Sequence, residues 1–283
     1  MNKKENREAI VIVLQAAKRI PNYLKRFGAL NGAGLFFHLE SSGKEDRTSR
    51  KHIRVPGIPE PVVLRSTIAD RSAFWICMVA EQYSIDRFPI HAHRVYKKYN
   101  DLVRRGEKPL IIDAGANIGM AALWYALKFP QATIFAIEPE ISNYEMLVEN
   151  TRAFHDRVIP FHGGIWPQKT QLNIVNKDAG AQHFQLDASD DSVAGLDSVT
   201  VDEILQRSEA DDILIAKIDI EGSQKALFSE NTRWVERVSL IVLELDDWLF
   251  PWAGTSRPFF SCVSEYPFDY LLDGENVFAF QDV

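Results

Sequence analysis

From residue 109 onward, unbroken apolar runs alternate with segments of helical character. Five of these runs have the length of a strand and are mostly apolar, at 110–115, 132–139, 157–166, 211–222 and 237–247. Strands of this kind are typical of parallel sheets whose two faces are both covered by helices. The last stretch, 268–280, predicts a hairpin around Asp273-Gly274. The sequence therefore predicts an α/β fold with a mostly parallel sheet.

The first hundred residues have a different pattern. An apolar stripe predicts a helix over about 4–27, and two β-like runs around a Pro/Gly turn predict a hairpin within 52–65. A further helix is expected over 70–83. We interpret 1–105 as an N-terminal helix and hairpin extension, followed by a larger domain over 106–283.

Composition limits the partners and the compartment. The chain has 283 residues, a formal net charge of −7 and a pI of about 5.6, which disfavours a nucleic acid as the main partner, although a local basic patch could serve. The apolar run 9–17 is too short to span a bilayer, so no membrane span is expected. It fits either a helix docked on the protein or a helix on a membrane surface. No signal peptide is evident, and Cys77 and Cys262 suit reduced thiols, so we expect a cytoplasmic protein.

The glycine-rich turn after the first apolar run carries an acid. Asp113 is followed by Gly115, Asn117 and Gly119 in "DAGANIG". A dinucleotide-binding turn uses Gly-x-Gly-x-x-Gly, and a carboxylate there would repel a pyrophosphate. S-adenosylmethionine has no phosphate, and its ammonium group could be held by such an acid while backbone N–H groups take its carboxylate. A purely structural turn with a solvated acid is the alternative.

A second acid ends the next apolar run. Glu138 lies twenty-five residues after Asp113, where a carboxylate can accept hydrogen bonds from both hydroxyls of a ribose. Nicotinamide-binding folds have an acid at this place too. Glu138 alone therefore does not discriminate, whereas Asp113 together with Gly115 and Asn117 favours S-adenosylmethionine.

Several motifs occur together in one order: "DAGANIG", "IEPE", "GGIW", "SVTVDEIL" and "KIDIEG". In this order and spacing the chain resembles the FkbM-like methyltransferases over about residues 62–250. The resemblance implies a Rossmann-like class I methyltransferase with a seven-stranded sheet, and O-methylation of a hydroxyl on a sugar, glycan or natural-product acceptor. It implies that S-adenosylmethionine is held by eight residues, namely Asp113, Gly115, Asn117, Gly119, Glu138, Pro139, Gly164 and Ile165.

The catalytic groups are expected where the strands end. Ligands of open α/β sheets bind beyond the carboxyl ends of the strands, which selects Lys217, Asp219, Glu221 and Asp246. Asp219 is the first candidate for the general base, and an ion pair with Lys217 that serves structure alone is the alternative. Members of the family often have Glu-x-His where this chain has Glu244-Leu245-Asp246, so Asp246 is a substitute candidate. We expect no metal.

Two rival functions remain at this point. A nicotinamide-dependent oxidoreductase is disfavoured by Asp113 and by the missing third glycine, and a non-catalytic methyltransferase-like binding module is disfavoured by the intact turn. The aromatic residues Trp248, Phe250 and Trp252 either stack on the acceptor or pack under the last helix.

Overall fold

The computed structural model describes residues 17–40, 45–174, 186–188 and 195–282. The chain divides into two compact units, Met1–Gln82 and Tyr83–Val283. Residues 4–16 of the helix predicted over about 4–27 lie outside the described residues. Within the described part, no helix is long and apolar enough to cross a membrane.

The N-terminal unit consists of a helical pair, a hairpin and a short helix. Its elements are α2 (Ile20–Phe27), α3 (Ala29–Glu40), β1 (Asp46–Ile53), β2 (Val62–Ser66) and α4 (Ile68–Phe74). The predicted hairpin is confirmed, because β1 and β2 are antiparallel with Ile53 opposite Val62. The helix expected over 70–83 begins earlier and ends earlier, since the Thr67 hydroxyl accepts from the Asp70 amide, and Trp75–Val79 continues as a π-helical turn.

A seven-stranded sheet forms the centre of the second unit. Its strands are β3 (Leu110–Ala114), β4 (Thr133–Glu138), β5 (Val158–His162), β10 (Ile213–Ile218), β11 (Leu240–Glu244), β12 (Phe268–Asp273) and β13 (Asn276–Gln281). Their order in the sheet is β12-β13-β11-β10-β3-β4-β5, and β13 is antiparallel to both of its neighbours. The predicted α/β class, mostly parallel sheet and C-terminal hairpin are confirmed.

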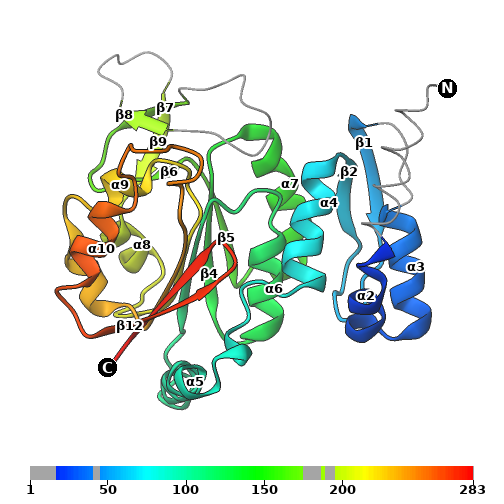
Figure 1. Cartoon of the computed structure of the whole chain (residues 1–283), viewed down its shortest axis with the longest axis horizontal. Helices are drawn as coiled ribbons and strands as arrows, with labels where there is room; N and C mark the ends of the chain where they lie inside the picture. The colour runs from blue at the N-terminus through cyan, green and yellow to red at the C-terminus, as the bar shows by residue number, and fades with distance from the viewer. Residues whose placement is uncertain (1–16, 41–44, 175–185, 189–194, 283) are drawn as a thin grey trace. The chain divides into compact units, whose positions relative to one another are not determined.

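Helices cover both faces of this sheet. They are α5 (Pro89–Arg104), α6 (Met120–Lys128), α7 (Ile141–Thr151), α8 (Val201–Arg207), α9 (Gln224–Leu227) and α10 (Arg257–Val263), with short 3₁₀ turns at Ile85–Arg87, Arg152–Phe154 and Thr232–Arg237. In Figure 1, α6 and α7 lie on one side of the sheet and α8, α9 and α10 on the other. Helix α5 precedes the junction expected near residue 105, and it belongs to the second unit.

The third predicted strand is split in two. Only β5 joins the large sheet, whereas Gly164–Ile165 forms β6 in a small sheet with β7 (Gln171–Ile174), β8 (Leu186–Ala188) and β9 (Leu196–Val199). Gly163 stands between the two strands, and a Cβ there would lie 2.1 Å from the Asp197 carbonyl oxygen. The glycines therefore let the chain leave one sheet and enter another.

Candidate functional site

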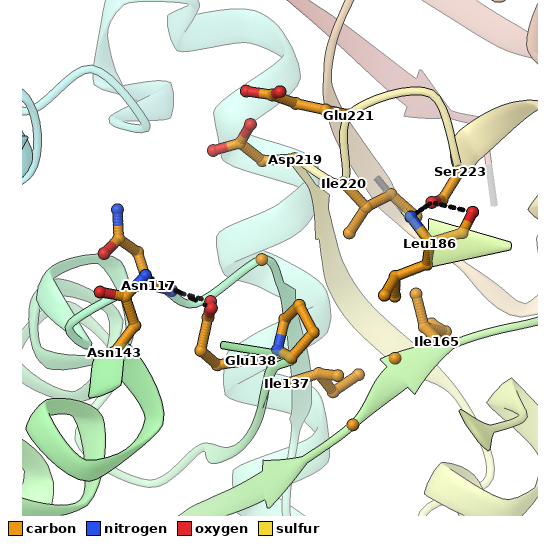
Figure 2. Close-up of a pocket in the computed structure, with 14 residues that line it drawn as sticks. Asn117, Ile137, Glu138, Asn143, Ile165, Leu186, Asp219, Ile220, Glu221 and Ser223 are labelled. Carbon is orange, nitrogen blue, oxygen red and sulfur yellow. Dashed lines mark hydrogen bonds between the residues drawn. The ribbon is translucent and has the colours of Figure 1, made fainter. Parts of the chain in front are cut away.

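One cavity opens at the carboxyl ends of β3, β4 and β10 (Figure 2). Its wall consists of Gly115, Asn117, Ile137, Glu138, Pro139, Asn143, Gly163, Gly164, Ile165, Leu186, Asp219, Ile220, Glu221 and Ser223. Its position agrees with the rule that ligands bind beyond the carboxyl ends of strands in open α/β sheets.

The glycine turn is fixed by its neighbours. Gly115 has φ +79°, and a Cβ on it would lie 1.9 Å from the Asp219 carbonyl oxygen, so this position requires glycine. The turn's own N–H groups are largely used within the chain: Gly115 and Ala116 donate to the Ile137 carbonyl, and Asn117 donates to Glu138. These three amides are therefore not available for a ligand carboxylate.

Glu138 faces this turn from the end of β4. One of its carboxylate oxygens accepts from the Asn117 amide at 2.7 Å, and the other accepts from the Glu140 amide at 3.0 Å. Burial raises the pKa of Glu138 to about 7, against the lowering effect of these two amides and of the Asn143 side chain. The backbone thus holds this carboxylate in a fixed orientation on the cavity wall.

Asp113 lies below the turn and does not line the cavity. Its side chain is fully buried, and Lys217, its parallel neighbour on β10, places Nζ 2.9 Å from its Oδ1. Lys217 also donates to the Gly115 carbonyl at 2.7 Å and lies 5.6 Å from the centre of the Tyr83 ring. Burial raises the pKa of Asp113, and the nearby ammonium opposes this. The acid at the turn therefore belongs to a buried ion pair that ties β3, β10 and the glycine turn together.

The carboxylates of Asp219 and Glu221 point to the same side, away from Ile220 (Figure 2). Asp219 is one-third exposed and lies 3.4 Å from Lys217, so the ammonium is shared between a buried and an accessible carboxylate. On the neighbouring strand β11, Glu244 is partly buried. Burial raises its pKa to about 8, and the charges of Asp219 and Glu275 add to this effect.

Asp246 and the aromatic residues that follow β11 lie in different surroundings. The Asp246 side chain accepts from the Gly222 amide and from the Gln224 side chain, and it does not line the cavity. Burial raises its pKa, and these two hydrogen bonds oppose the shift. Trp248 is 58% exposed and Trp252 fully exposed, so neither packs under the last helix.

The structure brings together eight of the twelve residues selected from the sequence. Those on the cavity wall are Gly115, Asn117, Glu138, Pro139, Gly164, Ile165, Asp219 and Glu221, and those behind it or beside it are Asp113, Gly119, Lys217 and Asp246. Gly119 starts α6, and a Cβ there would lie 2.9 Å from Leu147 Cδ1.

Sequence reasoning missed some of the wall. Asn143, Leu186 and Ser223 also line the cavity. Asn143 could have been found from its place in the first turn of the helix after Glu138, whereas nothing in the local sequence signals Leu186, which reaches the cavity from the small sheet. Among the described residues, no group of three or more His, Cys, Asp or Glu side chains is arranged to hold a metal ion.

Comparison with known proteins gives a family match. Residues 113–259, more than half of the chain, match the model of the methyltransferase FkbM domain. The hexuronic acid methyltransferase AglP of Haloferax volcanii is 23% identical over 139 residues, which are 49% of this chain and 56% of that protein. The methyltransferase sdnD of Sordaria araneosa is 38% identical over 73 residues, 24% of this chain and 27% of that protein.

The matches thus span about half of one curated relative and about a quarter of the other. Among solved structures, TrmK of M. capricolum in complex with S-adenosyl-homocysteine has a TM-score of 0.36 at 9% identity, covering 62% of this chain and 63% of that chain. A likeness this distant supports no argument about function.

Proposed function

The chain belongs to the FkbM methyltransferase family, and from this premise we propose that it transfers the methyl group of S-adenosylmethionine to a hydroxyl of a sugar, glycan or natural-product acceptor. One observation carries the proposal. A single cavity has Glu138, suited to bind a ribose, on one wall, and the accessible carboxylate of Asp219 on another.

The residues of the cavity fit this cofactor. Each Glu138 oxygen accepts one backbone N–H, and Oε1 also accepts from the Asn143 side chain at 3.5 Å, so Oε2 keeps a further lone pair for a ribose hydroxyl. Ile137, Ile165 and Leu186 give the same cavity an apolar wall suited to adenine. When bound, the cofactor supplies a methyl group that its sulfonium has already activated, so the protein has only to position the acceptor and take its proton.

Asp219 is the proposed general base. Its carboxylate lies at the cavity, and the ammonium of the buried Lys217 lies 3.4 Å from it and orients it. Asp113 and Lys217 act as positioning residues, because neither lines the cavity and both fix the turn and strand that do.

Two observations support the acceptor class. The relative from Haloferax volcanii is named for methylation of a hexuronic acid. Trp248 and Trp252 expose their rings on the segment that follows β11, and exposed aromatic rings stack on the apolar faces of sugars. No metal is needed, because a carboxylate base suffices for a hydroxyl acceptor.

Methyl transfer to a panel of hydroxylated sugars and natural products, followed by mass spectrometry with isotope-labelled cofactor, tests the proposal. Asp219→Asn should lower the transfer rate by roughly 10²–10⁴, the usual contribution of a positioned base, with little change in cofactor affinity. Asp212→Asn is the matched control. Asp212 directly precedes β10, at the end of the strand opposite Asp219, and its carboxylate pairs with Lys98. A normal rate with a lower melting temperature would show that Asp219 serves only the ion pair and would move the search for the base to Glu221.

A further inference from the structure

The two units of the chain carry opposite net charge. Residues 1–82 contain 14 Lys and Arg against 8 Asp and Glu, whereas residues 83–283 contain 18 against 31. Such an asymmetry indicates that the basic part meets a negatively charged partner. The N-terminal unit is therefore the part of an acidic protein that suits an anionic surface.

Helix α3 adds an apolar surface to this basic unit. Within its sequence, "ALNGAGLFFHLE", Glu40 is the one residue among Asp, Glu, Lys and Arg. One side of the helix is buried through Leu35, Phe36 and Leu39. On the opposite side Leu30 is 91% exposed and Phe37, seven residues later on the same face, is 65% exposed. A helix that is apolar all round normally has both sides covered, so its exposed side indicates a contact surface.

Exposed basic side chains lie on and beside the neighbouring helix α2. Helix α2 packs antiparallel beside α3 through a turn at Gly28, and the two helices lie side by side (Figure 1). Lys18, just before α2, and Lys25, within it, are exposed, and Leu24 on the same helix is 37% exposed. Arg26 is instead held by the Met78 carbonyl and by Glu81. The α2–α3 pair thus combines exposed lysines with exposed apolar side chains.

We propose that the α2–α3 pair docks on the surface of an anionic phospholipid bilayer, with Leu30 and Phe37 entering the interface and Lys18 and Lys25 meeting the headgroups. Interfacial helices combine these two kinds of side chain, because apolar burial and attraction to anionic lipid add together. A nucleic acid would leave Leu30 and Phe37 in water. A second copy of the chain would set a basic surface against itself.

Co-sedimentation of the full chain with lipid vesicles tests the docking. Vesicles with about one-third phosphatidylglycerol in phosphatidylcholine should bind at least about tenfold more protein than pure phosphatidylcholine, and binding should weaken as salt is raised. Leu30→Gln/Phe37→Gln should lower binding about tenfold at every salt concentration. Lys18→Glu/Lys25→Glu should lower it by a similar factor and remove most of the salt dependence.

Ile90→Gln is the matched control. Ile90 is 80% exposed at the second position of α5 in the acidic unit, as Leu30 is at the second position of α3, and its replacement should leave vesicle binding unchanged. Melting curves check that each variant is folded. If Leu30→Gln/Phe37→Gln is not folded, Leu30→Ser/Phe37→Ser is used in its place. Equal binding to neutral vesicles, or binding that the α2–α3 variants do not change, overturns the proposal. An absence of vesicle binding also overturns it. The surface would then be assigned to a dimer if a dimer forms that needs Leu30 and Phe37, or to a nucleic acid if the protein binds a DNA or RNA oligonucleotide.

Discussion

The two ends of the cavity hold their carboxylates in different ways. At the β4 end, Glu138 is held by the backbone amides of Asn117, in the turn after β3, and of Glu140, in the turn after β4. At the β10 end, Asp113, Lys217 and Asp219 hold each other through side chains that come from two strands. The first arrangement creates a rigid acceptor for neutral hydroxyls. The second is a cluster of three charged side chains, in which removing one charge changes the electrostatic stabilisation of the other two.

This difference predicts that the β10 end is the more fragile of the two. Lys217→Met should lower the free energy of unfolding by about 3–5 kcal/mol, because it leaves the fully buried Asp113 carboxylate without its counter-ion. Urea unfolding at neutral pH measures the effect. The double variant Asp113→Asn/Lys217→Met should recover most of the loss, since both charges are then gone. If the double variant is as unstable as the single one, the ion pair is not the cause.

The β4 end should affect ligand binding more than stability. Glu138→Ala should weaken S-adenosylmethionine binding by roughly 1–3 kcal/mol, the cost of losing a charge-assisted acceptor. Calorimetry measures this loss. Glu140→Ala is the control, because it removes a carboxylate two residues away that caps α7 through the Asn143 amide and does not line the cavity. Equal affinity in the wild type and Glu138→Ala would remove Glu138 from the ribose site.

The same contrast explains which parts of the site the sequence could predict. The alternation of strands and helices predicts the sheet. The place of Glu138 at the end of its strand can be predicted from the neighbouring residues in the sequence. The partner of Asp113 is not local, since Lys217 is more than a hundred residues away and meets it only through the register of β3 and β10. The sequence therefore predicts a contact between Asp113 and the ligand, whereas the structure places Asp113 beneath the turn.

Helix starts illustrate the same limit at shorter range. Ser142 with Glu145 three residues later has the pattern of a capping box, yet α7 begins at Ile141, and Glu140 accepts from the Asn143 amide at 2.7 Å. The chain has to turn directly after Glu138, so the tertiary position of the strand end fixes the start of the helix. A capping box does occur at Thr200 and Glu203, at the start of α8.

A third prediction uses the pH dependence of the charge balance. Burial and the neighbours Asp219 and Glu275 raise the pKa of Glu244 to about 8, whereas Lys217 lowers it. The folded state then holds this proton more tightly than the unfolded state, so stability falls as pH rises from about 4.5 to 8. Glu244→Gln should remove this part of the slope and gain about 1–2 kcal/mol near pH 8.5 relative to the wild type, with little difference at pH 4.

Melting curves of both proteins across this range measure the gain. Glu275→Gln is a useful companion, because it removes one of the two charges that raise the Glu244 pKa and should give a smaller gain of the same sign. A pH profile of Glu244→Gln that runs parallel to the wild type would mean that Glu244 is ionised at neutral pH.

The smallest expected effect is that of Asp246→Asn, which distinguishes Asp246 from Asp219 as the general base. Asp246→Asn keeps an oxygen that can still accept from the Gly222 amide or the Gln224 side chain, so the loss of stability should be about 1 kcal/mol. The rate of methyl transfer of Asp246→Asn should stay within about threefold of the wild type, because the Asp246 carboxylate faces the turn after β10 and not the cavity. The rate of Asp219→Asn should fall by at least about a hundredfold. Single-turnover kinetics on the two variants, side by side, measure this ratio. Equal losses would mean that the turn held by Asp246 positions Asp219, and the two acids would then act as one unit at the β10 end.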